Sequence, residues 1–320
     1  MSGFLVRFLV AFLFSSTLLA QTYPAKPVKI IVPFPVGGIA DIYSRLIGNR
    51  WSETWGQPVV VENRTGAGGN IAAEMVAKAA PDGYTLVMGS LGTHAVNVSL
   101  FSKLPYDPVR DFAPVALALE AEGLLVLHSS MPAKSVSELI AYARSKPGAL
   151  TYASAGAGTA SHLAGELFKT MAKVDMVHVP YKGNVPAITD LLAGQTSLLF
   201  GTMPTVLPQV HAGRLKALAV TGAARSPAAP ELPTVAEAAL PGFEVTNWIG
   251  IFAPAGTPRE IVARLNGEAN RTMQLPEIRG RLVNEGAKFT AKTPEEFGAF
   301  QKSEIAKWAK VVKSAGIRVD

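Results

Sequence analysis

Short apolar runs alternate with segments of helical periodicity along almost the whole chain. In the first part, the run VKIIV at 28–32 is typical of a strand. The same reasoning predicts further strands at 59–62 and 85–90, with helices at 39–55 and 70–80 between them. Strands that alternate with helices indicate crossover units, and therefore a largely parallel sheet with helices on its faces.

The alternation returns after a turn-rich stretch at 104–112 and two apolar runs within 114–128. This second series comprises strands at 150–155, 176–179, 197–201 and 216–221, and helices at 135–144, 159–172, 186–193 and 205–212. A Pro/Ala-rich loop follows at 223–233, and an extended stretch follows at 243–253. The tail is predicted to be helical, with helices at 257–274, 276–285 and 293–314. Three helices are predicted to begin with a capping box, formed by Ser135 and Glu138, Thr257 and Glu260, and Thr293 and Glu296.

The two series share one architecture, in which a strand leads through a glycine-rich turn into a helix. No repeat is visible residue by residue. The pattern predicts an α/β protein of two lobes, with lobe 1 formed by 21–120 plus 248–320 and lobe 2 by 121–247. Two segments, near 116–126 and 246–252, then cross between the lobes, and a ligand is expected in the cleft beside this hinge.

The first twenty residues have the composition of an export signal. Arg7 precedes a long apolar stretch and small residues lead to Ala20, after which a cut is predicted. Leu18 fits the small-residue rule for the cut poorly, and a membrane anchor remains the alternative, although the stretch is short for a span. The mature protein is accordingly expected outside the cytoplasm, in the periplasm.

Composition excludes several classes of protein. Of the 320 residues, 48% are hydrophobic, which is enough to form a hydrophobic core in each of two domains, and 17% are charged, which does not indicate disorder. No cysteine is present, which excludes disulfides, thiolate catalysis, thiolate metal sites and lipid attachment at a cleaved N-terminus. The net charge of +6 comes from scattered residues without a dense basic run, so no nucleic-acid partner is predicted.

Two glycine-rich loops stand at equivalent places, one in each series. The first, PFPVGGIAD at 33–41, follows a strand and begins a helix, and the second, SAGAGTASH at 154–162, does the same. Glycine lets the backbone approach a ligand, and the free N–H groups at a helix start favour an anion such as a carboxylate. A plain strand-to-helix turn is the alternative for the first loop, and a packing role is the alternative for His162.

Other small-residue segments are weaker candidates. The stretch 63–70 (NRTGAGGN) could line the cleft or form a structural turn, whereas 89–94 could add hydroxyl contacts through Ser90 and Thr93. Segment 201–203, with Thr202 and Met203, has the same place in the second lobe. Neither glycine-rich loop contains a lysine or arginine, and Arg64 and Lys182 are the nearest candidates for a charge partner.

Enzyme signatures are missing from the sequence. It contains no G-x-S-x-G, no G-x-G-x-x-G and no P-loop, and the five histidines lack metal-ligand spacing. No metal or cofactor is therefore predicted. A secreted hydrolase that uses Ser154 and His162 is the enzymatic alternative.

The chain resembles the Bug-type extracytoplasmic receptors of the tripartite tricarboxylate transporter family over nearly its whole predicted mature length. The matching segments, in order, are IIVPFPVGGIAD, VVVENRTGAGGNIAAE, AAPDGYTLVMGS, YDPVRDFAPV, TYASAGAGTASHLAGELF, VHVPYKG, TDLLAGQ, PTVAEA and WIGIFAPAGT. Val36 departs from the small alanine that is common in the family, which could narrow the cleft.

The resemblance implies a Venus-flytrap fold of the type II periplasmic-binding class and no catalysis. It implies a small carboxylate ligand, delivery to membrane transporter subunits and a monomeric receptor; a module that senses carboxylates for a membrane signalling protein is the alternative. The residues expected to bind the ligand by this resemblance, together with those proposed above, are Phe34, Gly37, Gly38, Ile39, Asp41, Ser90, Thr93, Ser154, Ala155, Gly156, Gly158, Thr159, His162, Thr202 and Met203.

Overall fold

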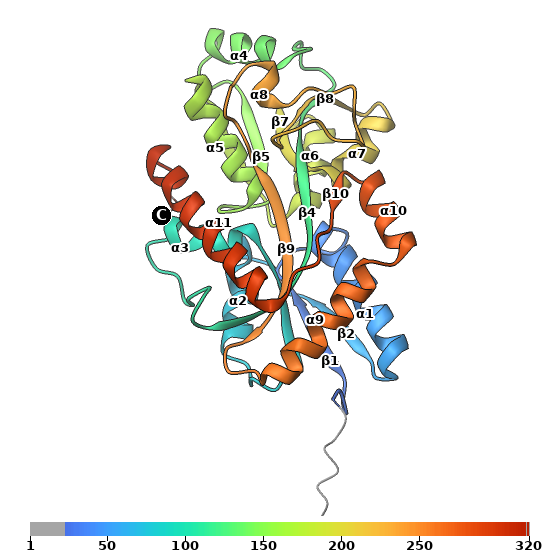
Figure 1. The fold of residues 1–320 in the computed structure, drawn as a ribbon. Coiled ribbons are helices and arrows are strands. Elements are labelled where there is room, and N and C mark those ends of the chain that lie inside the picture. Colours follow the sequence, from blue (N-terminus) through green and yellow to red (C-terminus); the bar gives the residue numbers. More distant parts are fainter. Residues whose placement is uncertain (1–22, 318, 320) are drawn as a thin grey trace, which may run out of the picture.

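One long strand joins the two lobes of the molecule. In the computed structural model, which describes residues 23–317 and 319, strand β4 runs without interruption over Phe112–His128 (Figure 1). Up to Glu122 it pairs with β9, and from Gly123 it pairs with β7 and β8 in the other lobe. A single strand thereby belongs to both halves of a continuous sheet. The predicted export signal at 1–20 lies outside the described residues.

The lower lobe in Figure 1 is built from both ends of the described chain. Its elements are β1 (Val28–Val32), α1 (Ile39–Trp55), β2 (Val59–Asn63), η1 (Ala67–Gly69), α2 (Asn70–Ala77), β3 (Thr85–Ser90), η2 (Gly92–Val96), α3 (Asn97–Leu100), β9 (Thr246–Pro254), α9 (Arg259–Met273), α10 (Pro276–Asn284), β10 (Ala287–Lys288) and α11 (Pro294–Ser314). Between these segments the chain forms the upper lobe, with α4 (Val136–Ser145), β5 (Thr151–Ser154), α5 (Ala160–Ala172), β6 (Val177–Pro180), α6 (Asn184–Leu192), β7 (Leu198–Thr202), α7 (Met203–His211), β8 (Leu215–Val220) and α8 (Val235–Ala238).

The strand order is β2-β1-β3-β9-β4-β7-β5-β6, with β8 and β10 also paired to β4. Pairs at both outer ends of this path are parallel, as predicted. The pairs that involve β4 or β9 are antiparallel, because these strands carry the chain across from one lobe to the other. The prediction of a largely parallel sheet is therefore wrong at the centre, and the sheet is mixed.

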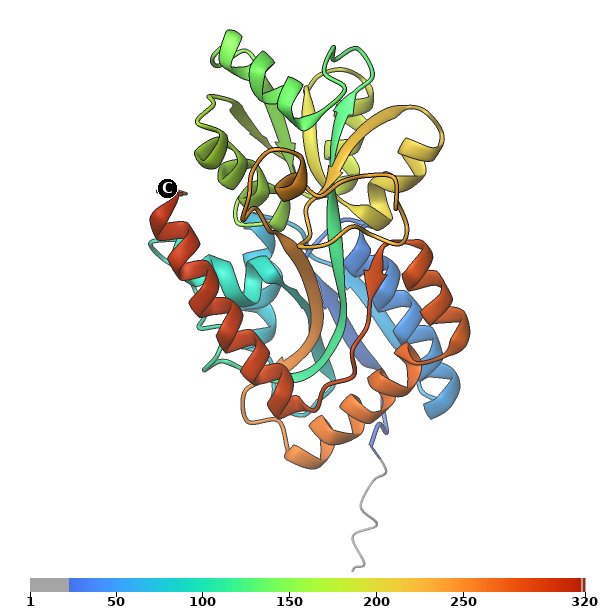
Figure 2. The same cartoon turned by 45° about the horizontal axis from the view of Figure 1, so that its top comes forward.

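Each lobe has three layers, with helices on both faces of its part of the sheet (Figure 2). In strand β1, Val28, Ile30 and Val32 pack toward α1 and α9, whereas Ile31 packs toward α2 and α11. The upper lobe packs α4 and α5 on one face and α6 and α7 on the other. The predicted α/β class with two lobes is confirmed.

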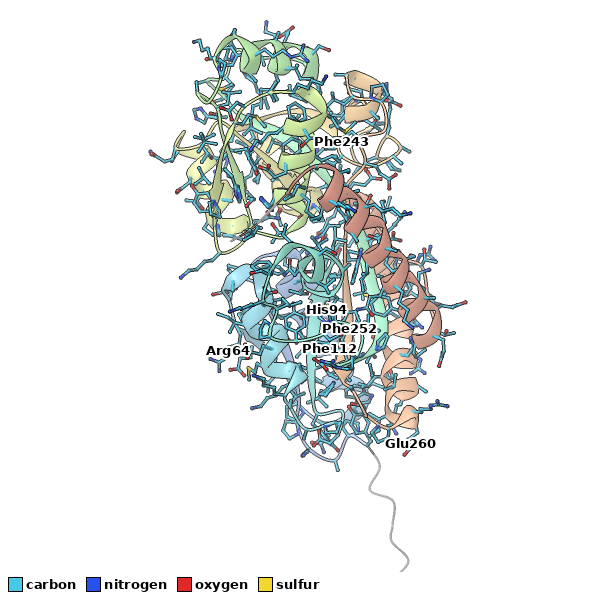
Figure 3. The ribbon with its side chains drawn as sticks, turned by 90° about the vertical axis from the view of Figure 1, so that its left-hand side faces the viewer. Arg64, His94, Phe112, Phe243, Phe252 and Glu260 are labelled. Atoms are coloured by element: carbon cyan, nitrogen blue, oxygen red, sulfur yellow. The ribbon has the colours of Figure 1, made fainter. Side chains whose placement is uncertain are left out.

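A buried aromatic cluster fixes the lower lobe beside the crossing strand β9. The ring of His94 stacks on Phe252 with centroids 3.9 Å apart, and Phe112 meets both rings edge-on (Figure 3). Burial lowers the pKa of His94 to about 3, so the ring is neutral and packs as an aromatic residue. His94 is thereby part of the core rather than of a binding site.

The sequence pattern predicted most of the helices, but some of the predicted helix ends and capping boxes differ from those in the structure. Thr293 and Glu296 form the predicted capping box of α11. Thr257 forms none, because its hydroxyl donates to the carbonyl of Pro254 and α9 begins two residues later. Helices α3 and α8 were not predicted, since each is only four residues long. Among the described helices, none combines the length and the apolar content that a bilayer crossing demands.

The chain crosses between lobes where β4 changes neighbours and again where β9 begins at Thr246. Both places fall within the segments expected to cross. The lobe boundaries themselves, 21–120 plus 248–320 and 121–247, remain predictions.

Candidate functional site

The two glycine-rich loops have nearly the same backbone conformation. Gly37 has φ of 82° and Gly158 has φ of 80°, in the left-handed region that favours glycine. The next residue is the N-cap of the helix in each case, with φ −77° and ψ 163° at Gly38 and φ −77° and ψ 161° at Thr159. The similarity that the sequence suggested at the level of architecture therefore extends to single torsion angles.

A side chain in the first helical turn holds each loop. The carboxylate of Asp41 accepts the N–H of Gly37 at 3.0 Å, and Nδ1 of His162 accepts the N–H of Gly158 at 3.2 Å. Both acceptors stand four residues after the glycine that donates to them. We conclude that Asp41 and His162 shape the loops, since neither lines the cavity between the lobes.

Asp41 is ionised in this position. Burial alone would raise the pKa of its carboxyl group, but hydrogen bonds from Arg45, from the Gly37 N–H and from Asn63 outweigh burial and hold the pKa below its usual value. Asn63 also donates to the carbonyl of Phe34 at 2.8 Å, which connects β2 to the loop. The negative charge is neutralised locally by Arg45 at 2.9 Å.

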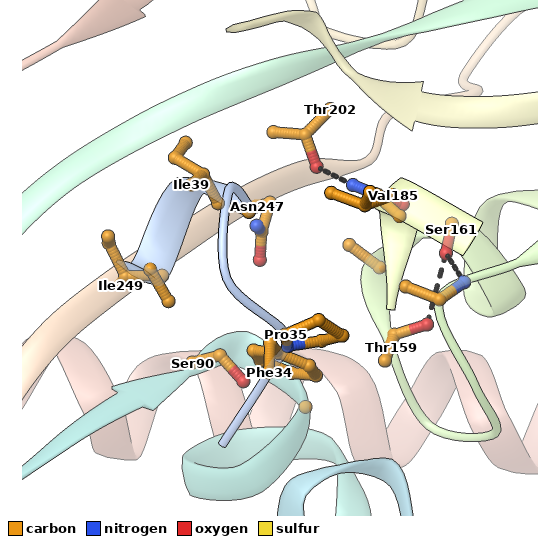
Figure 4. Close-up of a pocket in the computed structure, with 16 residues that line it drawn as sticks. Phe34, Pro35, Ile39, Ser90, Thr159, Ser161, Val185, Thr202, Asn247 and Ile249 are labelled. Carbon is orange, nitrogen blue, oxygen red and sulfur yellow. Dashed lines mark hydrogen bonds between the residues drawn. The ribbon is translucent and has the colours of Figure 1, made fainter. Parts of the chain in front are cut away.

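Four helices begin at one cavity between the lobes. They are α1 from the lower lobe and α5, α6 and α7 from the upper lobe (Figure 4). The cavity has a volume of about 40 Å³, several times the ~10–15 Å³ that one water needs. Its lining consists of Phe34, Pro35, Gly38, Ile39, Ala40, Ser90, Gly92, Ala155, Thr159, Ala160, Ser161, Asn184, Val185, Thr202, Asn247 and Ile249.

No side chain caps any of these four helices. Uncapped starts also occur away from the cavity, at α2, α3, α9 and α10, whereas α4, α8 and α11 are each capped by a hydroxyl, from Ser135, Thr234 and Thr293. At the cavity, the first-turn N–H groups of Ile39, Ala40, Ala160 and Ser161 have no acceptor among the described residues. Unpaired N–H groups together with the positive ends of the helix dipoles favour an anion at this place.

No ionisable side chain lines this cavity among residues 23–317 and 319. Arg64, at the surface of the lower lobe in Figure 3, pairs with Glu62, and Lys182 is exposed. Neither therefore supplies a cation to the cavity. An anion bound there would be held by backbone groups, hydroxyls and amides alone.

The remaining surface of the cavity has an apolar side and a polar side. Phe34, Ile39 and Ile249 supply hydrocarbon. Across from them, Asn184 donates through Nδ2 to the hydroxyl of Thr202 at 2.8 Å, and Figure 4 shows this bond beside Val185. A guest with one charged end and a short carbon chain matches this division.

The structure divides the predicted binding residues into two groups. Phe34, Gly38, Ile39, Ser90, Ala155, Thr159 and Thr202 line the cavity. The others are not among its lining residues and are Gly37, Asp41, Thr93, Ser154, Gly156, Gly158, His162 and Met203. Thr93 is buried, and its hydroxyl accepts the N–H of Ser90 at 3.0 Å, so it supports a lining residue rather than reaching the cavity.

Ser154 does not pair with His162. Its hydroxyl lies 2.6 Å from Nε2 of His178, and the ring of His178 stands between Tyr152 and His162. Ser154 is fully buried, so a substrate could not reach its hydroxyl. The geometry gives no support to the hydrolase alternative.

Several lining residues were not among the predicted ones. Asn184 and Val185 begin α6 just after the segment VHVPYKG (177–183), which contains strand β6, so their place near a strand's carboxyl end was an available signal. Asn247 and Ile249 lie on β9, where alternation along a crossing strand does not reveal which face meets the cleft.

The lobes meet along a closure seam of backbone atoms beside the cavity. We define this seam by Gly68 and Gly92 of the lower lobe and Ala157 and Gly158 of the upper lobe. A methyl group on Gly68 would clash with the carbonyl oxygen of Ala157, and one on Gly92 would lie 2.8 Å from that of Gly158. The predicted segment 63–70 thus contributes a contact between lobes and does not line the cavity.

A family comparison decides the class of protein. The family model described as the tripartite tricarboxylate transporter family receptor, TctC, matches residues 43–317. The chain belongs to this receptor family. The protein BugT of Bordetella pertussis is 37% identical to this receptor over 301 residues, which cover 94% of this chain and 92% of BugT.

Solved structures of similar proteins carry small carboxylates. The structure of Rpa4515 from R. palustris with adipate is 42% identical, with a TM-score of 0.90 over 92% of this receptor and 99% of that chain. MatC from Rhodopseudomonas palustris with bound malate is 40% identical, with a TM-score of 0.87, and the match covers 91% of this receptor and 100% of MatC. These comparisons establish a periplasmic-type solute-binding receptor rather than an enzyme, as predicted.

Protonation of His162 should couple stability to pH. Burial lowers the pKa of this ring to about 4, below the ordinary ~6.5, so the unfolded chain takes up the proton first as the pH falls. Its contribution to the free energy of unfolding is complete above pH ~6.5 and declines toward pH ~4. Urea unfolding should show that His162→Gln removes about 1–2 kcal/mol of the stability difference between pH 7 and pH 5.

The matched control is His211→Gln, which changes an exposed histidine at the end of α7. It should leave the pH dependence as in the parent chain. Equal slopes for the parent and for His162→Gln would contradict this account of the buried ring.

Proposed function

We propose that this receptor captures a small aliphatic carboxylate between its lobes and delivers it to the membrane subunits of a tripartite transporter. The observation that carries the proposal is the set of four uncapped helix N-termini around a cavity without an ionisable lining side chain. The carboxylate headgroup would accept hydrogen bonds from the backbone N–H groups at the starts of α1 and α5. Ser90 and Thr159 would add hydroxyl contacts.

Several features support an aliphatic acid as the ligand class. Adipate and malate, found in the similar proteins, are short chains with carboxylate ends. The cavity of about 40 Å³ is small, and its side near Phe34 and Ile249 is apolar. Such a surface would hold methylene groups, at about 0.8 kcal/mol for each one buried.

Neutral donors suit a protein that must release its cargo. A carboxylate gains charge-assisted hydrogen bonds from N–H groups without the bidentate geometry that an arginine would impose. Since no titratable group lines the cavity, binding should be independent of pH wherever the ligand is ionised.

Closure of the two lobes around the ligand would create the state that the transporter recognises. The contact between Gly68 and Ala157 joins the lobes, whereas the ligand would bind helix starts from both. A ligand with contacts to both lobes shifts the population toward the closed form. A sensing role would use the same closure. The family description favours transport, and co-purification of the membrane partner would separate the two roles.

We further propose that residues 1–20 are an export signal removed after Ala20 and that the mature receptor is a monomer in the periplasm. Membership of a receptor family of periplasmic type supports the location. The intact mass of the exported chain and its sedimentation behaviour would test the cut and the monomer.

Calorimetric titration tests the proposed function. The receptor, first unfolded and refolded to remove carried-over ligand, should bind at least one of adipate, malate, succinate, citrate and benzoate. The matching neutral amide should bind about 100-fold more weakly, because the charge-assisted bonds are lost. The affinity for the acid should be equal at pH 6 and pH 8. A folded sample that binds none of these acids, or binds the amide equally well, would overturn the proposal.

Substitution in the closure seam should weaken binding without any contact to the ligand. Gly68→Ala places a methyl group against the Ala157 carbonyl, so the lobes cannot shut fully, and the dissociation constant should rise about tenfold or more. X-ray scattering with saturating ligand should show a larger radius of gyration than the parent chain.

Gly56→Ala is the control, because Gly56 has the same φ of 63° and has no atom within 4 Å of an added methyl group. It carries the same backbone strain at a site far from the seam. Equal affinities for the two variants would show that contact at Gly68 does not limit closure.

A further inference from the structure

Two hydroxyl groups lie between the buried ring of His94 and the ligand cavity. Ser90 ends strand β3, and Thr93 and His94 belong to η2. Oγ1 of Thr93 lies 2.8 Å from Nδ1 of His94 and 3.3 Å from Oγ of Ser90. All three side chains are buried, and of the three only Ser90 lines the cavity, where Figure 4 shows its hydroxyl group. This row of side chains connects a core histidine to a residue that would contact the ligand.

The hydrogen-bonding capacity of Thr93 limits how the row can be arranged. A hydroxyl oxygen accepts two hydrogen bonds and donates one. Oγ1 of Thr93 already accepts the N–H of Ser90 at 3.0 Å. One lone pair is left, and either the imidazole of His94 or the hydroxyl of Ser90 can donate to it. The position of the proton on the His94 ring decides between the two donors.

The surroundings of His94 favour a proton on Nδ1. Because burial lowers the pKa of His94 to about 3, the ring is neutral and only one of its nitrogens has a proton. Nδ1 faces Thr93, whereas Nε2 has no hydrogen-bond partner among the described residues, and the ring packs against Phe112 and Phe252. Buried N–H groups without an acceptor are rarer than buried acceptors without a donor. The proton therefore belongs on Nδ1, where it can donate to Thr93.

We propose that His94 is a positioning residue that keeps the hydroxyl proton of Ser90 free for the ligand. Its Nδ1–H takes the last lone pair of Thr93, so Ser90 cannot donate to Thr93. Oγ of Ser90 accepts the N–H of Thr93 at 3.3 Å, and its own proton points into the cavity, toward a carboxylate oxygen. This inference rests on the proposed function, since it needs a carboxylate beside Ser90.

The nitrogen resonances of the His94 ring test the proton position without any ligand. In receptor labelled with ¹⁵N at its five histidines, His94 should show a protonated Nδ1 and an unprotonated Nε2 at pH 7. Nuclear Overhauser contacts with the rings of Phe112 and Phe252 identify its signals, because both rings pack against it. A proton on Nε2 would overturn the inference.

Calorimetry tests the effect on binding, with the acid that binds most tightly among adipate, malate, succinate, citrate and benzoate. His94→Phe keeps an aromatic ring in the core but removes the donor, so Ser90 can turn its proton toward Thr93. The dissociation constant should rise about tenfold or more, as expected for the loss of one hydrogen bond to a charged group. Ser90→Ala should show a similar rise. The double variant should bind no more weakly than Ser90→Ala, because His94 acts through Ser90.

His94→Asn and Phe112→Leu are the controls. Asparagine offers an amide N–H in place of the Nδ1–H, so the dissociation constant should stay within about threefold of the parent value. Phe112→Leu disturbs the same aromatic cluster but leaves the donor to Thr93 in place. It should lower the melting temperature and leave the affinity unchanged.

The outcomes separate this inference from the proposed function. If the parent chain binds none of the acids, the proposed function fails and this inference fails with it. If the parent chain binds, but the losses in His94→Phe and Ser90→Ala multiply in the double variant, or Phe112→Leu weakens binding equally, then His94 acts only through packing and the proposed function stands. The proton position is measured on the unchanged chain, so it decides the question if a His94 variant does not fold.

Discussion

The proposed function requires a negative charge to be held between two lobes without a cation. Removing a carboxylate from water is costly unless hydrogen bonds replace its hydration. Here backbone N–H groups can replace the hydrating water, since the first turns of α1 and α5 contain N–H groups that make no hydrogen bond to another described group. The positive ends of the helix dipoles act in the same direction. Both lobes must come together for the two sets of donors to converge.

The topology accounts for this convergence. Helices α1, α5, α6 and α7 each follow a strand that is parallel to its neighbour, and helices that follow parallel strands begin at the strands' carboxyl ends. In both lobes these ends face the cleft. Gly37 and Gly158 then let the chain turn into the helix, with Asp41 and His162 fixing the turns from behind.

Sequence reasoning located the two loops because their signals are local. Glycine at a position of positive φ, a strand before it and a helix after it can all be recognised in a few residues. The role of Asp41 and His162 was less accessible, since a polar residue in the first turn can face the ligand or turn back to its own loop. The antiparallel pairing of the central strands and the cavity residues Asn247 and Ile249 were missed because they depend on the long-range contact of β4 with β9. Strand periodicity shows that faces alternate, but it does not show which face meets a second lobe.

Backbone amide resonances would test the central claim most directly. In ¹⁵N-labelled receptor titrated with a carboxylate that binds, the amide protons of Ile39, Ala40, Ala160 and Ser161 should show the largest downfield shifts, as new hydrogen bonds to an anion require. The loop amides of Gly37 and Gly158, already bonded to Asp41 and His162, should shift much less. Shifts concentrated around arginine or lysine side chains, with the four helix-start amides unchanged, would contradict the account.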